Sequence, residues 1–185
     1  MVSCPMWDSD LSKWIRKHYP EEETTILDIG AGNGKYRRLL GDYYDNMDAV
    51  EIWDDYIPQL KERDKYRYVF HCDARKFKFT EKYDIVIMGD VLEHMTVEDG
   101  QKLIDYILQN TRELIVVVPY MYPQHALYGN TYEIHLQPDL TPDNVTERYP
   151  QLHMLYSRFN PNVGFKGIGV FISTLPKNSD MQIIT

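Results

Sequence analysis

The chain has 185 residues, of which 43% are hydrophobic, so it is long enough to bury the core of one domain. Its 28 Asp and Glu residues outnumber its 20 Lys and Arg residues, which gives a formal net charge of −8. Without a dense basic run to neutralise a phosphate backbone, nucleic acid is a disfavoured partner. The sequence also lacks a signal-peptide pattern, a membrane-spanning apolar run and metal-ligand spacing between its two cysteines. We therefore expect one domain over residues 1–185, located in the cytoplasm, with reduced thiols and no membrane partner.

The first predicted element is an amphipathic helix over residues 7–18, in an N-terminal segment that ends at Pro20. Its apolar stripe consists of Trp7, Leu11, Trp14 and Ile15. Residues 24–29 then read as a short buried strand, and residues 36–44 read as a helix that follows a glycine-rich loop. The strand, the glycine-rich loop and the helix over residues 36–44 form one β-loop-α unit.

The same alternation continues through the middle of the chain. Further strands are predicted over residues 47–52, 66–72, 83–88 and 112–118. Further helices are predicted over residues 53–63 and 97–109. Within the strand over 112–118, the run Leu-Ile-Val-Val-Val at residues 114–118 is continuously apolar, as expected for a strand that is buried on both faces. We therefore predict an α/β fold: a doubly wound, mostly parallel seven-stranded sheet with helices on both faces and an antiparallel last strand.

The C-terminal third begins with a long loop over residues 119–140 that is rich in Tyr, His and Pro. Loops of this length usually carry function, and we expect this one on the substrate side. The Thr141-Pro142 pair then has the signature of a helix start. Two closing strands are predicted over residues 153–159 and 167–174. Residues 176–185 are expected to form a disordered tail.

The stretch ILDIGAGNGKY covers the end of the first predicted strand and the turn after it, and it places three glycines at Gly30, Gly32 and Gly34. In a doubly wound sheet, ligands bind beside this turn, and glycine lets the backbone approach them closely. The dinucleotide fingerprint requires its third glycine where this chain has Lys35, and the P-loop pattern is also absent. The spacing therefore disfavours a nicotinamide dinucleotide or a nucleoside triphosphate.

From residue 7 to residue 174, the sequence resembles the class I S-adenosylmethionine-dependent methyltransferases. DIGAGNG looks like the family's first motif, whose backbone cradles the amino-acid part of the cofactor. Glu51 stands where the family binds the ribose hydroxyls, and Asp73 stands where it binds the adenine amino group. After the fourth strand, the segment GDVLEH looks like the VLEH form that is frequent in small-molecule methyltransferases. The cofactor-binding residues implied by the resemblance are Asp28, Gly30, Ala31, Gly32, Gly34, Glu51, Ile52, Asp73, Ala74, Gly89 and Asp90.

Three histidines are candidates for a general base, because a neutral imidazole can accept a proton from an acceptor hydroxyl. His94 follows the fourth strand, where the acceptor is expected. His125 and His135 lie in the long loop and flank a group that we expect to form a lid over the acceptor. That group consists of Tyr128, Asn130, Tyr132 and Glu133.

The segment that runs from Asp90 to His94 raises a metal hypothesis. Relatives in ubiquinone biosynthesis and in small-RNA end modification carry Glu-x-x-Glu-His here and use it to bind a divalent metal. This chain has the shorter Asp90 in the first place, and the sequence identifies no fourth ligand. We therefore predict no metal and expect Glu93 to bond to the loop backbone.

The resemblance implies transfer of a methyl group from S-adenosylmethionine to a small-molecule or glycan acceptor, with oxygen favoured, leaving S-adenosylhomocysteine. The Asn/Asp-Pro-Pro-Tyr segment of nucleic-acid amine methyltransferases is absent after the fourth strand. The N-terminal helix and the 119–140 loop are expected to wall the acceptor site, unless a second subunit of a homodimer does so. Two alternatives stay open: a catalytically silent binding module with this fold, and a nicotinamide-dependent enzyme.

Overall fold

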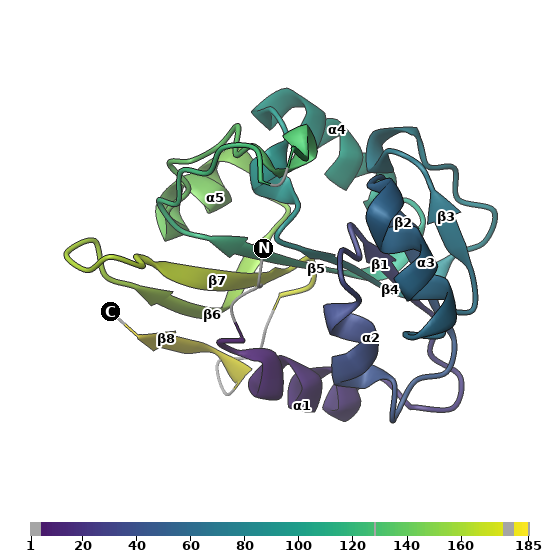
Figure 1. Ribbon diagram of the computed structural model, residues 1–185. Helices are drawn as coiled ribbons and strands as arrows, with labels where there is room; N and C mark the ends of the chain where they lie inside the picture. Colours follow the sequence, from purple (N-terminus) through teal and green to yellow (C-terminus); the bar gives the residue numbers. More distant parts are fainter. Residues whose placement is uncertain (1–4, 128, 176–179, 185) are drawn as a thin grey trace.

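A computed structural model describes residues 5–127, 129–175 and 180–184, and it has one twisted sheet with helices on both faces (Figure 1). The strands are β1 (Ile26–Ile29), β2 (Met47–Glu51), β3 (Val69–His71), β4 (Tyr83–Gly89), β5 (Thr111–Pro119), β6 (His153–Phe159), β7 (Gly167–Ile172) and β8 (Gln182–Ile184). The α-helices are α1 (Asp8–His18), α2 (Lys35–Leu40), α3 (Ile57–Glu62), α4 (Val97–Leu108) and α5 (Pro142–Arg148). Short 3₁₀ turns occur at η1 (Asp54–Tyr56), η2 (Ala74–Lys76), η3 (Leu92–His94) and η4 (Thr131–Glu133).

The strand order in the sheet is β3-β2-β1-β4-β5-β7-β6-β8. Strands β1 to β5 pair in parallel, whereas β7 is antiparallel to both of its neighbours, β5 and β6. This confirms the predicted doubly wound fold and its antiparallel closing strand. The order reverses at β1, so the loops after β1 and β4 diverge and leave a crevice at the carboxyl edge of the sheet.

The described residues form eight strands, one more than the seven predicted. Residues 182–184, expected in a disordered tail, form β8 and pair in parallel with β6 (Figure 1). Just before β8, the buried Asp180 carboxylate lies 2.6 Å from Lys17 Nζ at the end of α1. A contact between residues so far apart in the chain leaves no periodic signal in the sequence. The expected tail residues 176–179 and 185 lie outside the described part.

Consecutive strand residues point to opposite faces of the sheet, and helices cover both faces, so side chains on both faces are buried. In β1, Ile26 packs with apolar side chains from α1, α2 and α3, whereas Leu27 packs with those from α4 and α5. All four residues of β1 and all five of β2 are buried. The central strands are therefore held rigidly, and their carboxyl ends can position a site. No helix in the described ranges has the length and apolar character that crossing a membrane requires.

Candidate active site

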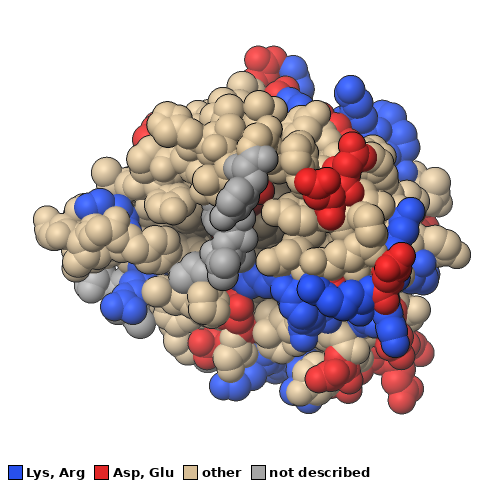
Figure 2. All heavy atoms as spheres, viewed as in Figure 1, with Lys and Arg blue, Asp and Glu red and all other residues tan. Residues whose placement is uncertain are grey.

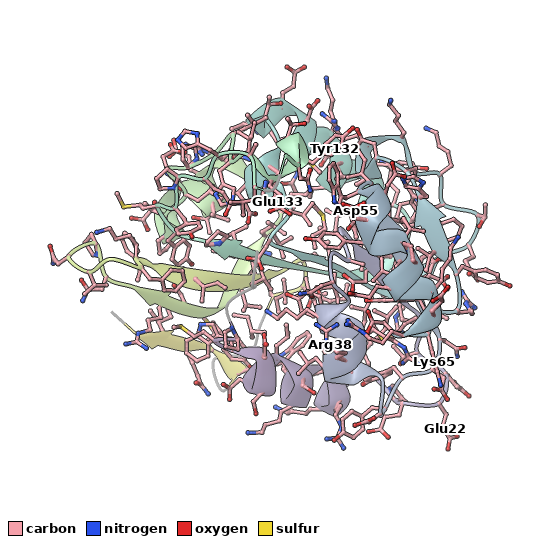
Figure 3. All side chains as sticks on the ribbon, in the orientation of Figure 1. Glu22, Arg38, Asp55, Lys65, Tyr132 and Glu133 are labelled. Carbon is pink, nitrogen blue, oxygen red and sulfur yellow. The ribbon has the colours of Figure 1, made fainter. Side chains whose placement is uncertain are left out.

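A cavity of about 420 Å³ opens at the carboxyl ends of β1 to β4. Its walls come from the loops that follow these strands and from residues 130–136, which lie in the long loop after β5. Figure 3 places Tyr132 and Glu133 across from Asp55, which follows β2. The predicted cofactor residues that line the cavity are Gly30, Ala31, Gly32, Glu51, Ile52, Asp73, Ala74, Gly89 and Asp90. The volume is within the range of about 300–1,000 Å³ that is common for small-molecule sites.

The three glycines of the loop after β1 have different roles. All three have positive φ, which favours glycine. A Cβ on Gly30 would lie 2.4 Å from Val91 Cγ2, and one on Gly34 would lie 2.2 Å from an oxygen of the Asp64 carboxylate. At Gly32 the nearest atom to such a Cβ would be 3.8 Å away. The fold therefore requires Gly30 and Gly34, whereas Gly32 leaves open space in the cavity wall. Gly34, a predicted cofactor contact, does not line the cavity.

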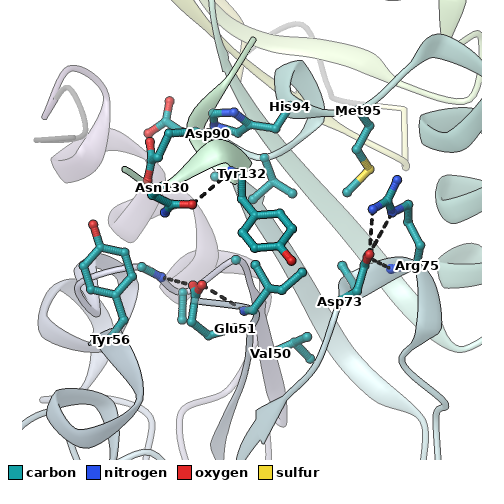
Figure 4. Close-up of a pocket in the computed structure, with 18 of the residues that line it drawn as sticks. Val50, Glu51, Tyr56, Asp73, Arg75, Asp90, His94, Met95, Asn130 and Tyr132 are labelled. Carbon is teal, nitrogen blue, oxygen red and sulfur yellow. Dashed lines mark hydrogen bonds and ion pairs between the residues drawn. The ribbon is translucent and has the colours of Figure 1, made fainter. Parts of the chain in front are cut away.

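Glu51 ties the glycine loop to the end of β2. One carboxylate oxygen accepts a hydrogen bond from the Gly32 N–H at 2.7 Å, and the other accepts from the N–H groups of Ile52 and Trp53 at 2.8 and 2.7 Å. The side chain is buried and borders the cavity (Figure 4). Burial raises the pKa of Glu51, although the three N–H donors oppose this shift. Glu51 thus fixes the loop and also offers lone pairs to a ligand.

Asp28, the other predicted acid near the loop, is fully buried and does not line the cavity. It accepts a hydrogen bond from the Tyr66 hydroxyl, and its second oxygen has no partner in the described structure. It lies within β1, two residues before Gly30, and its side chain points into the core. Burial raises the pKa of Asp28 to about 7. The structure therefore gives Asp28 a supporting place beneath the loop.

The raised pKa of Asp28 predicts a pH-dependent stability. A carboxyl group whose pKa is higher in the folded state favours folding at low pH, and this contribution is lost as the pH rises from about 4 to about 7. Between pH 5 and pH 7, the free energy of unfolding of the wild type should fall by about 2 kcal/mol relative to Asp28→Asn. Urea unfolding of both proteins at each pH measures this difference. Parallel stability curves would contradict it.

Asp73 lines the cavity at the end of β3, as predicted, and is held by Arg75. The Arg75 guanidinium lies 3.0 and 2.6 Å from the two carboxylate oxygens of Asp73 (Figure 4). It also contacts Asp99. The hydrogen bonds from Arg75 hold the pKa of Asp73 below its usual value. A permanently ionised Asp73 can accept a further hydrogen bond from a ligand amino group.

Tyr36, in the first turn of α2, was missed as a site residue. Its ring lines the cavity beneath Gly89, and its buried hydroxyl has no hydrogen-bond partner among the described residues. A buried hydroxyl without a partner costs about 1–3 kcal/mol, so a ligand that bonded to it would recover that energy. The sequence signal for Tyr36 was its position directly after the glycine motif, in the first turn of the helix that follows the loop.

We therefore expect Tyr36→Phe to have opposite effects on folding and binding. Removal of the unpaired hydroxyl should raise the free energy of unfolding of the ligand-free protein by about 1 kcal/mol. It should also weaken the binding of a ligand that uses the hydroxyl by about tenfold. Thermal unfolding and calorimetric titration measure the two effects. Destabilisation of the ligand-free variant would show that the hydroxyl already has a partner.

The three candidate histidines lie in different environments. The His94 ring lines the cavity on the side of Met95 and Ile134. His135 is buried behind it, with the ring centroids 4.7 Å apart. His125 is exposed and outside the cavity wall, so the expected pair of loop histidines does not face a ligand. Of the three, only His94 can touch an acceptor in the cavity.

Glu93 is not bonded as expected. Its backbone carbonyl accepts hydrogen bonds from the N–H groups of Leu136 and Gln137. Both carboxylate oxygens, however, are buried without a hydrogen-bond partner in the described structure. Hydrogen bonds from the loop therefore reach the backbone of Glu93 and not its side chain, which lies beside the half-buried His94 and the buried His135.

The expected acceptor wall is formed by part of the long loop. Asn130, Thr131, Tyr132, Glu133, Ile134 and Leu136 line the cavity. The Asn130 side chain accepts from the Tyr132 N–H at 2.9 Å and caps η4 (Figure 4). Tyr128, also expected in this lid, lies outside the described residues. Contrary to expectation, no described residue of α1 lines the cavity, because that helix packs its apolar stripe on the sheet.

Surface charge near the cavity is largely internally paired. Figure 2 shows Lys and Arg side chains gathered in a band on the viewed face, over α2 and the neighbouring end of α3. Arg38 in α2 and Arg63 at the end of α3 both contact the buried Asp64 carboxylate and the carbonyl oxygen of Asn33. These two arginines thus brace the glycine loop from outside.

Comparisons with known proteins agree with this architecture. Residues 27–113 match the family described as a methyltransferase domain. No curated protein matches the sequence. A methyltransferase of Clostridium acetobutylicum described as S-adenosylmethionine-dependent has a similar structure, with a TM-score of 0.69 at 11% identity over 95% of this chain and 93% of that one.

Two further structures of this fold contain S-adenosylmethionine. One is an amino pentose methyltransferase of calicheamicin biosynthesis from Micromonospora echinaspora, with a TM-score of 0.64, 11% identity and 90% coverage of each chain. The other is magnesium protoporphyrin IX methyltransferase from Synechocystis, with a TM-score of 0.63, 13% identity and coverage of 91% of this chain and 79% of that one. At these identities the likeness is one of fold, and the chain has the Rossmann-like fold of the class I methyltransferases.

Proposed function

We propose that the protein transfers a methyl group from S-adenosylmethionine to an oxygen atom of a small-molecule or glycan acceptor. The observation that carries the proposal is the convergence of an open Gly32 wall, the Glu51 carboxylate and the unpaired Tyr36 hydroxyl on one cavity. The cavity lies beyond the carboxyl ends of parallel strands, where doubly wound folds bind their ligands.

The cavity residues divide into groups that match the parts of the cofactor. The loop at Gly30–Gly32 and the Tyr36 hydroxyl would hold its methionine part, because they offer backbone contact and a free polar group. Glu51 would accept hydrogen bonds from the ribose hydroxyls. Asp73 would accept from the adenine amino group, with the apolar side chains of Val50 and Met95 lining the same cavity.

The acceptor would enter beside His94 and the 130–136 wall. When bound, the cofactor supplies a sulfonium methyl group that is already activated for transfer. The task of the protein is therefore to align the acceptor oxygen with that methyl group and to exclude water. Burial lowers the pKa of His94, so its ring is neutral at pH 7 and can take up a proton or a ligand through a ring nitrogen.

A transfer assay with methyl-labelled S-adenosylmethionine tests the proposal. A panel of hydroxylated metabolites, nucleotide sugars and glycans should give labelled product with at least one member, and His94→Ala should reduce turnover with cofactor affinity nearly unchanged. Cofactor binding without transfer to any panel member would favour a silent binding module. Binding of a nicotinamide dinucleotide in the presence of excess S-adenosylhomocysteine would favour the third alternative.

A further inference from the structure

A buried cluster of three side chains lies behind the acceptor side of the cavity. It consists of Glu93, His94 and His135, and one potential ligand atom of each lies within 4.8 Å of the others. Glu93 is completely buried, and neither of its carboxylate oxygens has a hydrogen-bond partner among the described residues. His135 Nε2 is also buried and unpaired. Burial of an unpaired carboxylate is costly, so the cluster requires a cation or a shared proton that the rest of the described chain does not supply.

The backbone around the cluster orients both imidazoles. His135 Nδ1 lies 2.5 Å from the carbonyl oxygen of Tyr122, and His94 Nδ1 lies 3.2 Å from that of Ile134. A carbonyl oxygen only accepts, so the Nδ1 of each ring that faces one carries the proton, and the Nε2 of His135 keeps its lone pair. Histidines that ligate metals are usually held this way. The His94 ring also has a backbone contact with Asp90.

We infer that Glu93, His94 and His135 bind a divalent transition-metal ion. Two imidazoles and one carboxylate suit Zn²⁺, Fe²⁺, Mn²⁺ or Co²⁺, whereas Mg²⁺ and Ca²⁺ prefer oxygen ligands. The structure replaces the ligand set considered from the sequence, since His135 joins Glu93 and His94 where Asp90 was considered. Three protein ligands leave coordination positions for a non-protein group.

The place of the cluster indicates what that group is. His94 both belongs to the cluster and lines the cavity, so an open position would face the acceptor. Metal binding itself is independent of the proposed function, whereas this role rests on it: the ion would hold an acceptor hydroxyl. A divalent ion acts as a Lewis acid and lowers the pKa of a coordinated hydroxyl. His94 is then a ligand, and no separate side-chain base is required.

The test uses the full chain without a polyhistidine tag, stripped of metal by a chelator that is then removed by dialysis. Co²⁺ should give visible d–d absorption bands with a 1:1 end point, and Zn²⁺ should bind with a micromolar or tighter Kd by calorimetry. Glu93→Gln and His135→Gln should each weaken Zn²⁺ binding by at least about 100-fold. The matched control is His153→Gln, which removes a histidine of β6 outside the cluster and should bind like the wild type.

Two outcomes would overturn the inference. In the first, the wild type and both cluster variants bind Co²⁺ equally. In the second, the wild type binds no Co²⁺ and Glu93→Gln raises its melting temperature, which would show that Glu93 and His135 share a proton. S-adenosylhomocysteine titration of the same samples separates the two proposals. Metal failure with intact cofactor binding rejects only the metal site, and cofactor failure with intact metal binding rejects only the proposed function.

Discussion

Glu51→Ala should lower both the stability of the protein and its affinity for the cofactor, and no other substitution that we consider should lower both as much. The substitution removes the acceptor for three backbone N–H groups, those of Gly32, Ile52 and Trp53. At about 1–3 kcal/mol for each buried donor left unpaired, the free energy of unfolding should fall by about 3 kcal/mol or more. Affinity for S-adenosylhomocysteine should fall by more than about 100-fold, because the ribose loses its acceptor and the glycine loop loses its anchor.

Glu113→Ala is the matched control for this prediction. Glu113 is also fully buried and accepts from two backbone N–H groups, those of Ser173 and Thr174, but it lies near the amino end of β5, away from the cavity. Its removal should cost a similar amount of stability and leave the affinity of the folded protein unchanged. Urea unfolding and calorimetry measure both quantities. A folded Glu51→Ala protein with wild-type affinity would show that Glu51 does not contact the ligand.

Gly32→Ala should strongly weaken cofactor binding at a small cost to folding. Gly32 has φ of +53°, and an added Cβ would meet nothing closer than 3.8 Å. The substitution should therefore add backbone strain that lowers the free energy of unfolding by only about 1–2 kcal/mol. The added methyl group would occupy the cavity wall against which the methionine part is expected. We therefore expect the Kd for S-adenosylhomocysteine to rise at least about 100-fold, as measured by calorimetry.

Gly129→Ala is the matched control for Gly32→Ala, because it adds similar backbone strain at a residue that does not line the cavity. Gly129 has φ of +81°, an added Cβ would contact nothing within 4 Å, and the residue is outside the cavity wall. This variant should show a similar fall in melting temperature and wild-type affinity. If both glycine variants bind equally well, the ligand does not approach the Gly32 backbone. Gly30→Ala cannot replace this test, because its Cβ would collide with Val91 and change the fold.

The fold was predictable because its signals are local. The central strands contain short apolar runs, and β1, β2 and β4 are each followed by a turn and a helix, which is the pattern of a doubly wound sheet. The predicted helix start at Thr141 is confirmed by a reciprocal cap with Asn144. Strand β8 was not predictable, because the contact between Asp180 and α1 joins the two ends of the chain. Such long-range contacts have no period in the sequence.

The site was predictable to the extent that strand ends determine it. Glu51 and Asp73 end adjacent parallel strands, so topology alone brings them to one edge. The depth of a side chain is a property of three-dimensional packing, which is why Asp28 and Gly34 are behind the cavity wall. The cluster of Glu93 and His135 joins residues from two loops that meet only in the folded chain. The sequence therefore identified these residues as candidates but could not show that they lie together.

Calorimetric titration of the purified protein with S-adenosylhomocysteine, with nicotinamide adenine dinucleotide as the control, tests the central claim most directly. We predict 1:1 binding of S-adenosylhomocysteine with a micromolar Kd and no heat from the dinucleotide. Binding of the dinucleotide alone, or of neither compound, would contradict the assignment of this cavity to S-adenosylmethionine.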